Sequence, residues 1–393
     1  MKKQTVRYGA LWAILLLLTE VVVTAQEKPV RLNGYLKYLG MYYQPDFPLP
    51  GFDSRHLSSH LLHNRLNFSW YASENFTLTV EGRNRLLFGK LVKNYPGYRK
   101  MTDSDPGFFD LSATLASGNG WFFLSNIDRA YLDFSKGKWQ IRAGRQRINW
   151  GINLVWNPND IFNTFDYFDF DYEERPGADA LKVQYYTGAT SSGELVFKPG
   201  RHSGETALAG LYRFSQWNYD FQFLGGVTGP DLVVGSGWSG DIRGGGFRGE
   251  VSWFIPRQAN PDSYQALVAS LSGDYSFSKG FYLHGGFLFN SHGTTGPAGG
   301  RLLFDQQLSA KMLSLARWSL FGQCSYPVTP LFNAALSGIV NPGDHSFYIG
   351  PSFTYSLGNN LEVLLTGQLF SGDSGTEFGD YGKLLFARLK WAF

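Results

Sequence analysis

The sequence predicts an all-β protein, a transmembrane antiparallel up-and-down β-barrel of about eighteen strands. Three observations predict it. Apolar and polar residues alternate along most of the chain, long connections alternate with short turns, and no run of about 18 apolar residues follows the N-terminal segment. Charged residues make up 17% of the 393 residues, against about 25% in an average soluble domain. The net charge of +3 is too small to indicate a nucleic-acid partner.

The first element is an export signal. Basic residues near the N-terminus precede an apolar core at 8–23, and residues 23–25 fit the small-x-small rule for cleavage. We therefore expect a signal peptide over 1–25 that is cleaved after Ala25. An uncleaved anchor helix is the alternative. The mature chain, 26–393, is expected to form a single barrel.

Alternation is clearest in the last strand that the pattern predicts, 380–393. Arg388 and Lys390 lie between its apolar residues, so one face is apolar and the other carries cations. The apolar set is Leu385, Ala387, Leu389, Trp391 and Phe393. A soluble β-sandwich alternates in the same way, so this pattern alone does not choose between the two.

Connection lengths favour the barrel. Long loops at one end and tight turns at the other are typical of transmembrane barrels, with the turns facing the periplasm. A barrel of about eighteen strands is also wide enough for an aqueous lumen. Sixteen strands is the alternative, because the segment 193–241 has short strands rich in glycine. The long extracellular loops are expected at 45–57, 92–120, 150–177 and 292–311.

The C-terminal residues carry a resemblance. Leu389, Trp391 and Phe393, at alternate positions of the last strand, resemble the signature by which bacterial outer-membrane barrels are recognised for insertion. This implies a location in the cell outer membrane, with outer-membrane lipid and the barrel-insertion machinery as partners. The Ala25-Gln26 junction resembles signal-processing sites common in Bacteroidetes.

A second resemblance lies inside the chain. Residues 142–151, which read RAGRQRINWG, are followed by Asn157-Pro158-Asn159-Asp160. Together they resemble the "GRQ…WG…NP.D" stretch of some porin-like and alginate-export-like families. The resemblance covers about twenty of the 393 residues. It implies a porin-like channel and does not specify a substrate.

If apolar side chains face lipid, the alternate set faces the lumen. Five adjacent predicted strands then place cations on one inner wall. Rings of Arg or Lys favour anions, and the alternative is that these are ordinary solvated residues of a lumen. Arg145 and Arg147 fall on the opposite face unless a bulge near Gly144 turns them inward. The expected pore-lining residues are Arg65, Arg83, Arg85, Arg129, Arg142 and Lys182.

The loop 150–177 combines carboxylates with many aromatic residues. A long loop this apolar does not stay in water, so we expect it to fold into the barrel and narrow the pore. Its acids would then face the arginine wall. An outward loop packed on its neighbours is one alternative. Calcium binding is another, although the loop lacks the spacing of an EF-hand. The acids are Asp160, Asp166, Asp169, Asp171, Glu173 and Glu174.

The sequence contains no G-x-S-x-G, H-E-x-x-H or P-loop motif, so we expect neither an enzyme nor a cofactor. We expect no metal site either, because alternation places His60 and His63 on opposite faces. The expected function is diffusion of small hydrophilic solutes through a porin-like, anion-leaning channel. Two alternatives stay open, a channel specific for an oligosaccharide or organic acid and a non-conducting structural or assembly barrel. The oligomeric state is not predicted.

Overall fold

The computed structural model describes residues 29–46, 56–95, 97–164, 166–258, 260–261, 263–298 and 308–393. The expected signal peptide over 1–25 lies outside these residues, as do parts of the expected loops 45–57 and 292–311. Within the described part, no helix is long and apolar enough to span a membrane.

Almost all of the elements are strands. The first nine are β1 (Val30–Gln44), β2 (Leu57–Tyr71), β3 (Phe76–Phe88), β4 (Ser112–Gly118), β5 (Trp121–Lys136), β6 (Trp139–Gln146), β7 (Ala178–Tyr186), β8 (Ser191–Lys198) and β9 (Ala207–Gln216). The others are β10 (Tyr219–Thr228), β11 (Asp231–Ile242), β12 (Gly245–Pro256), β13 (Ala266–Ser276), β14 (Tyr282–Asn290), β15 (Trp318–Thr329), β16 (Phe332–Asn341), β17 (Ser346–Gly358), β18 (Leu361–Ser371) and β19 (Lys383–Ala392). Three short helical segments are α2 (Lys90–Asn94), α3 (Tyr98–Thr102) and η2 (Ser203–Glu205).

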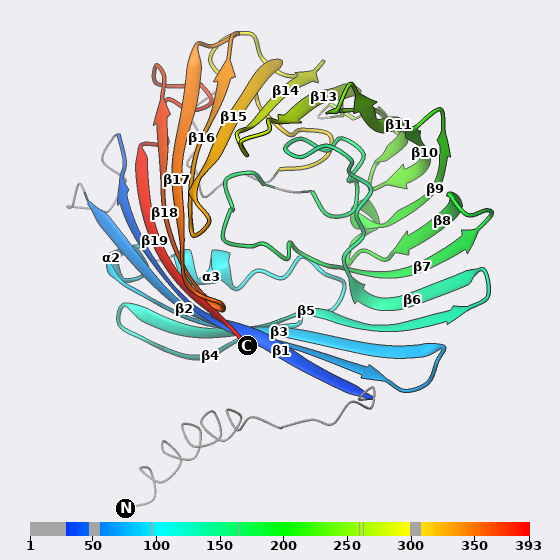
Figure 1. Ribbon diagram of the computed structural model, residues 1–393, viewed down its shortest axis with the longest axis horizontal. Coiled ribbons are helices and arrows are strands. Elements are labelled where there is room, and N and C mark those ends of the chain that lie inside the picture. Colours follow the sequence, from blue (N-terminus) through cyan, green and yellow to red (C-terminus); the bar gives the residue numbers. More distant parts are fainter. Residues whose placement is uncertain are drawn as a thin grey trace, which may run out of the picture.

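Strand pairing closes the sheet into a ring (Figure 1). Each strand pairs antiparallel with the next, except that β3 pairs with β5, and β1 closes the ring with β19. Among the described strands β4 pairs only with β5, so the ring itself has eighteen members. The prediction of an eighteen-stranded barrel is confirmed. Closure satisfies backbone groups that would each cost several kcal/mol if left unpaired in hydrocarbon.

The expected loop 92–120 contains regular structure that alternation did not predict. It holds the short helix α3 and the strand β4, and α2 begins just before it. β6 pairs only with the second half of β5, from Ala130 to Lys136. β4 fills the place that β6 leaves, pairing with β5 between Trp121 and Asn126. Seven residues that are mostly small give too weak an alternation to be read as a strand.

A bulge lies in β5 rather than in β6. Pairing of β3 with β5 shifts between Glu81 and Gly82, so that one residue of β5 is unmatched there. As a result Asp128 and Arg129, which are neighbours in the chain, are both buried. The pairing of β5 with β6 runs without a shift across Gly144, so the bulge expected at that residue is absent.

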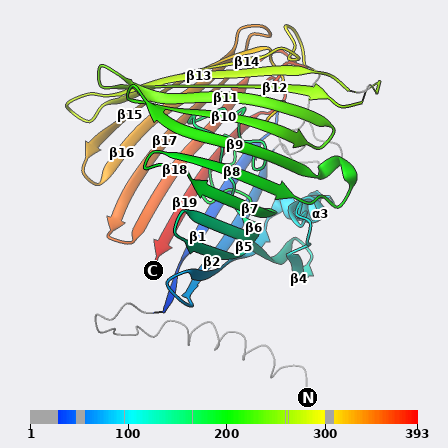
Figure 2. The same ribbon diagram turned by 90° about the vertical axis from the view of Figure 1, so that its right-hand side faces the viewer.

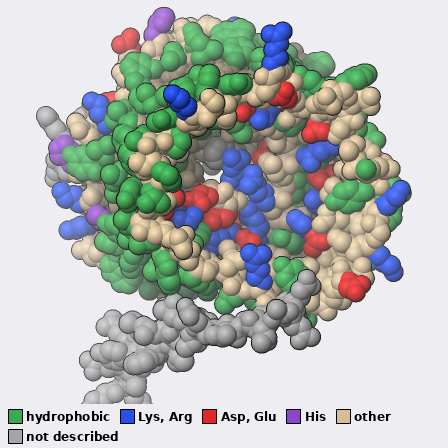
Figure 3. All heavy atoms as spheres, in the orientation of Figure 1, with side chains coloured by type: hydrophobic (Ala, Val, Ile, Leu, Met, Phe, Trp, Pro, Cys, Tyr) green, Lys and Arg blue, Asp and Glu red, His purple; other side chains and the backbone are tan. Residues whose placement is uncertain are grey.

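The two faces of the wall differ as alternation predicts. On β2, Leu62 and Trp70 are 40% and 45% exposed, whereas His63 and Arg65 are 2% and 0% exposed. Apolar side chains gather on the left and upper parts of the barrel in Figure 3. The polar side chains of the alternate positions therefore meet inside the barrel, where they shape the lumen.

Most of the tight turns lie at one end of the barrel, whereas the two-residue connection between β10 and β11 lies at the other. Between β9 and β10, Trp217 and Asn218 have φ of 55° and 60°, and two successive positive φ values are typical of a type I′ hairpin turn. β1 begins and β19 ends at this same end (Figure 2). The inserted segment described next enters from the opposite end.

Candidate functional site: the lumen and its inserted loop

The connection between β6 and β7 lies inside the barrel. Figure 1 shows this segment, 150–177, running within the ring of strands. Near its start, Trp150 Nε1 donates a hydrogen bond to Glu194 on β8. Near its end, Glu173 pairs with Arg388 on β19. The described residues of this inserted loop therefore contact the inner wall at widely separated strands.

One carboxylate on β12 holds the first half of the inserted loop. Glu250 is 1% exposed and accepts hydrogen bonds from the backbone N–H of Asn153 at 2.7 Å and of Asn159 at 2.9 Å. It also accepts one from the N–H of Ile152. Charge-assisted bonds of this kind are about twice as strong as neutral ones. A single side chain thus fixes both ends of the turn at 152–159.

The Asn-Pro-x-Asp motif lies beside this carboxylate. The Asn159 side chain donates to the backbone oxygen of Ser236 at 3.0 Å and accepts from the Ser252 hydroxyl at 2.7 Å. Asn157 packs against Gly151, where a Cβ atom would lie 2.4 Å from its Oδ1. The motif at 157–160 therefore shapes the inserted loop and attaches it to β11 and β12.

The middle of the inserted loop is apolar and packs against the far wall. Phe168 makes edge-to-face contacts with Tyr348 and Phe370, both at 5.1 Å between ring centroids. Phe170 contacts Phe386 on β19 in the same way at 4.9 Å. Aromatic pairs in this geometry contribute about 0.5–1.5 kcal/mol each beyond the area that they bury.

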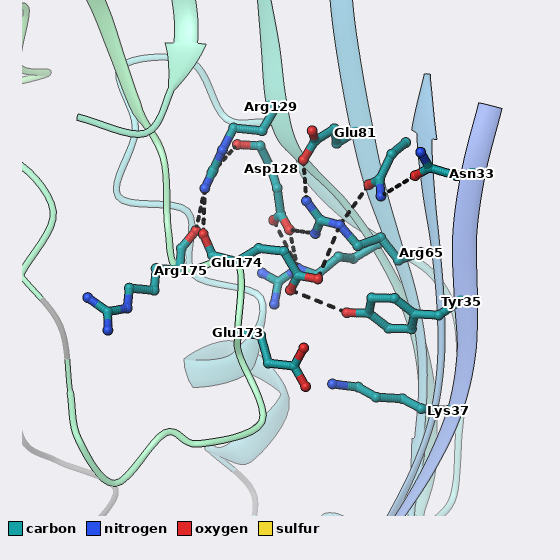
Figure 4. Close-up of polar contacts among 12 residues, drawn as sticks. Asn33, Tyr35, Lys37, Arg65, Glu81, Asp128, Arg129, Glu173, Glu174 and Arg175 are labelled. Carbon is teal, nitrogen blue, oxygen red and sulfur yellow. Dashed lines mark hydrogen bonds and ion pairs between the residues drawn. The ribbon is translucent and has the colours of Figure 1, made fainter. Parts of the chain in front are cut away.

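Three loop acids pair with cations of the wall. Asp171 contacts Lys37 at 2.7 Å. Glu174 lies 3.6 Å from Arg65 and accepts a hydrogen bond from the Tyr35 hydroxyl at 3.3 Å (Figure 4). Glu173 pairs with Arg388 at 2.9 Å and with Lys390 at 2.7 Å. These contacts attach the end of the inserted loop to β1, β2 and β19.

The other three acids are buried without such partners. Neither Asp160, Asp166 nor Asp169 forms an ion pair with a described residue. Burial raises the pKa of Asp160 to about 7 and that of Asp169 to about 6, and it raises the pKa of Asp166 as well. Asp160 and Asp169 are therefore largely protonated in mildly acidic solution.

Most of the expected pore-lining cations have acid partners. Arg65 lies between Glu81 and Asp128, both at 2.5 Å (Figure 4). Asp128 also receives a bond from Arg83 Nε at 2.8 Å. The wall thus carries acids between the cations that the sequence predicts there.

Acids also neutralise three further cations of the wall. Arg142 pairs with Asp133 at 2.6 Å, and Lys182 lies 3.5 Å from Glu194. Arg145 pairs with Asp105 and with Asp179, at 2.5 and 2.8 Å. Each of these cations is held by an acid of its own or a neighbouring segment.

Two of the expected cations differ from the rest. Arg85 donates to the Asn126 side chain at 2.8 Å and has no ion pair with any residue that the structure describes. Arg129 donates to the backbone oxygens of Glu174 and Arg175, at 2.7 and 2.8 Å. Arg85 therefore contributes a positive charge without a direct ion pair among the described residues.

Several important residues were missed from the sequence. Alternation places Glu81 and Asp133 inward, yet it does not say which cation each meets, because that depends on the register between strands. Asp128 is buried through the bulge in β5. Glu250 is an inward residue of β12, and nothing in the sequence marks it as the partner of the inserted loop.

The inserted loop does not fill the lumen. A cavity of about 420 Å³ lies between the loop segment 166–172 and the wall formed by β1–β3. A second cavity, of about 360 Å³, lies between the loop and β16–β18. Figure 3 shows a hollow in the middle of the barrel with Lys and Arg side chains on one side and Asp and Glu side chains on another.

The described part of the chain holds no group of three or more His, Cys, Asp or Glu residues placed to bind a metal ion. Three of the loop acids that we considered for calcium contact cations of the wall, and the other three are buried without an ion pair among the described residues. Three of the six loop carboxylates thus attach the end of the loop to the wall.

The chain forms a closed antiparallel barrel of eighteen strands with a loop held inside it. No protein-family model and no curated protein matches the chain. Solved structures of bacterial outer-membrane porins do. OccAB1 of Acinetobacter baumannii matches with a TM-score of 0.58 and 10% identity, over 95% of this chain and 99% of that one.

Two further solved structures are similar to the same extent. OccK11 of Pseudomonas aeruginosa has a TM-score of 0.58 and 8% identity, over 95% of this chain and 99% of that one. OccAB4 of Acinetobacter baumannii has a TM-score of 0.56 and 10% identity, over 92% and 98%. At such identity the likeness extends to the fold.

Proposed function

We propose that the chain is an outer-membrane porin-like channel for the diffusion of small hydrophilic solutes, with the inserted loop 150–177 as its constriction. The observation that carries this proposal is the loop itself, held inside an eighteen-stranded barrel while leaving cavities open beside it. A polar lumen inside an apolar wall is the arrangement by which such barrels conduct solutes.

Two features support a location in the outer membrane: the apolar outer face of the wall and the sequence signals near both ends of the chain. The outward residues are apolar over most of the ring. The signature at Leu389, Trp391 and Phe393 supports insertion by the barrel-insertion machinery, and the expected signal peptide over 1–25 supports export. A Bacteroidetes-type origin is consistent with the Ala25-Gln26 junction.

Ion selectivity is proposed to lean weakly toward anions. Among the expected pore-lining cations, the charges of Arg65, Arg83, Arg142 and Lys182 are offset by acids within 4 Å. Arg85 and Arg129 are the cations of this set without an ion pair among the described residues. Two unpaired positive charges in a narrow lumen favour anions only modestly.

The test is single-channel conductance of the folded mature protein in a planar bilayer, with a salt gradient to read the reversal potential. We expect stable open steps, a reversal potential displaced toward that of the anion, and larger steps when 160–172 is deleted. Absence of steps from protein shown to be inserted would support the non-conducting structural or assembly barrel instead. Unchanged conductance after the deletion would show that the loop is not the constriction.

A substrate-specific channel is the second candidate. Tyr167 and Phe170 of the inserted loop line one cavity, and aromatic surfaces of this kind let sugar rings slide. The resemblance at 142–151 and 157–160 to alginate-export-like families points the same way. Addition of an oligosaccharide or of an organic acid to one side of the bilayer distinguishes the two candidates. Brief, concentration-dependent blocks by one of them indicate a specific site, and their absence indicates a general porin.

A further inference from the structure

A polar patch lies on the outer face of the barrel, on β2, β3 and β5. From β8 to β19, away from the strand ends, the outward residues of the described wall are apolar or glycine, with Ser236 as the exception. On β2, β3 and β5 the outward positions of one row are instead Asn64, Asn84 and Ser125. These three residues are termed the asparagine patch.

The patch lies at the depth of the hydrocarbon. Asn64 is the middle residue of β2, which extends over Leu57–Tyr71, so it is far from both membrane surfaces. Its neighbours His63 and Arg65 are buried inside the barrel, and Leu62, two residues away, is 40% exposed on the outside. Alternation therefore places the Asn64 side chain on the outer face.

The hydrogen bonds within the patch do not use all of its N–H donors. Asn84 Nδ2 donates to Asn64 Oδ1 at 3.3 Å, and the Ser125 hydroxyl donates to Asn84 Oδ1 at 2.9 Å. Asn64 Nδ2 donates to the backbone oxygen of Tyr35 at 3.5 Å. An amide nitrogen carries two N–H groups, so the second N–H of each asparagine has no acceptor among the described residues. Acyl chains offer none, and an unsatisfied group there costs several kcal/mol.

We propose that the asparagine patch is the surface on which a second copy of this chain binds. An amide carries both donors and acceptors, so the patch can hydrogen-bond to the same patch of another copy, as the isologous interfaces of symmetric oligomers require. Gly82, in the adjacent row of β3, lets the second wall approach. The position of its missing Cβ meets nothing nearer than the Asn126 oxygen at 3.6 Å.

Between membrane helices, small residues let the backbones approach and polar side chains hydrogen-bond across the contact, and the same physics applies to two barrel walls. Acyl chains cannot use these donors and acceptors, whereas an identical wall supplies both. The interface does not depend on what passes through the lumen, so it stands or falls separately from the channel function.

The first experiment measures the mass of the folded mature protein in lipid nanodiscs by light scattering. We expect at least twice the mass of one chain. Replacing both asparagines, Asn64→Leu with Asn84→Leu, is expected to reduce it to one chain. Ser236→Leu, the same change at an outward polar residue elsewhere on the wall, is the control and should leave the assembly intact. A wild-type mass of one chain, or an intact assembly in the double variant, would overturn the proposal.

A cross-linking experiment tests the same interface if the double variant folds poorly, because it changes only one residue of the patch. The lone cysteine, Cys324, faces outward on β15, outside the patch, because it pairs with the 48% exposed Leu336. With Cys324→Ser and Asn64→Cys combined, oxidation in the membrane should produce disulfide-linked dimers. Wild-type protein, with Cys324 alone, is the control. If Asn64→Cys yields no more dimer than Cys324 does, the patch is not an interface.

Discussion

Replacing Glu250 by glutamine is expected to release the first half of the inserted loop. The carboxylate accepts three backbone N–H bonds, from Ile152, Asn153 and Asn159. Hydrogen bonds to a charged group contribute about 1.5–3 kcal/mol each. Glutamine keeps one acceptor oxygen and turns an N–H toward the others. We estimate a loss of about 2–4 kcal/mol in loop attachment, since these bonds share one group and do not add.

That loss corresponds to a rise of about 30- to 1,000-fold in the population with a released loop, at about 1.4 kcal/mol for each tenfold. The assay is limited proteolysis of the folded protein, read as cleavage within 150–177, with single-channel current noise alongside. Asp274→Asn is the matched control, because Asp274 is an inward acid of β13 that pairs with Arg248 and forms no hydrogen bond or ion pair with the described residues of the loop. Equal cleavage and equal noise in the two variants would refute the role given to Glu250.

Three further predictions concern the charges of the lumen. Asp171→Asn leaves Lys37, whose side chain is 1% exposed, without its acid and should weaken loop attachment by about 3 kcal/mol, seen as faster proteolysis of the loop. Because the pKa of Asp169 is raised to about 6, from about 3.9 in an unfolded chain, the docked loop binds more protons than the released one. Its attachment should weaken as the pH rises through 4 to 6, and Asp169→Asn should flatten the dependence of proteolysis on pH; an unchanged profile would contradict this. Arg85→Gln should displace the reversal potential toward cations, whereas Arg85→Lys should preserve it.

The fold was predictable because the wall must present one apolar face along its whole length. Every strand has one apolar face outside and one polar face inside. Alternation of apolar and polar residues therefore stays visible even where the strands are short, as over 193–241. Alternation alone predicted that Arg65 points into the barrel and that Leu62, three residues before it, points outward. The strand β4 was not predictable from the sequence. It fills the space beside the first half of β5 that the short strand β6 leaves unpaired, and this space exists only in the folded ring.

The site was predictable in outline only. A loop with alternating acids and aromatic residues predicts that the segment leaves water, and the structure places it inside the barrel. Which groups it meets depends on the tilt and register of strands that are far apart in sequence. Lys37 and Arg388 came from the first and last strands, which no local pattern connects. The bulge that adds Asp128 to the wall is a single extra residue, and neither Gly nor Pro marks it.

The pairing of β1 with β19 has a consequence for how the molecule assembles. Glu173 reaches Arg388 and Lys390 across 215 and 217 residues of chain, and Asp171 reaches Lys37 on the other side of the same junction. The anchoring points of the loop are therefore complete only once the last strand has arrived beside the first. Such distant contacts form late and slowly. A barrel in which β1 and β19 have not yet paired lacks part of the surface that holds the end of the inserted loop, so pairing of these two strands must precede complete docking of the loop.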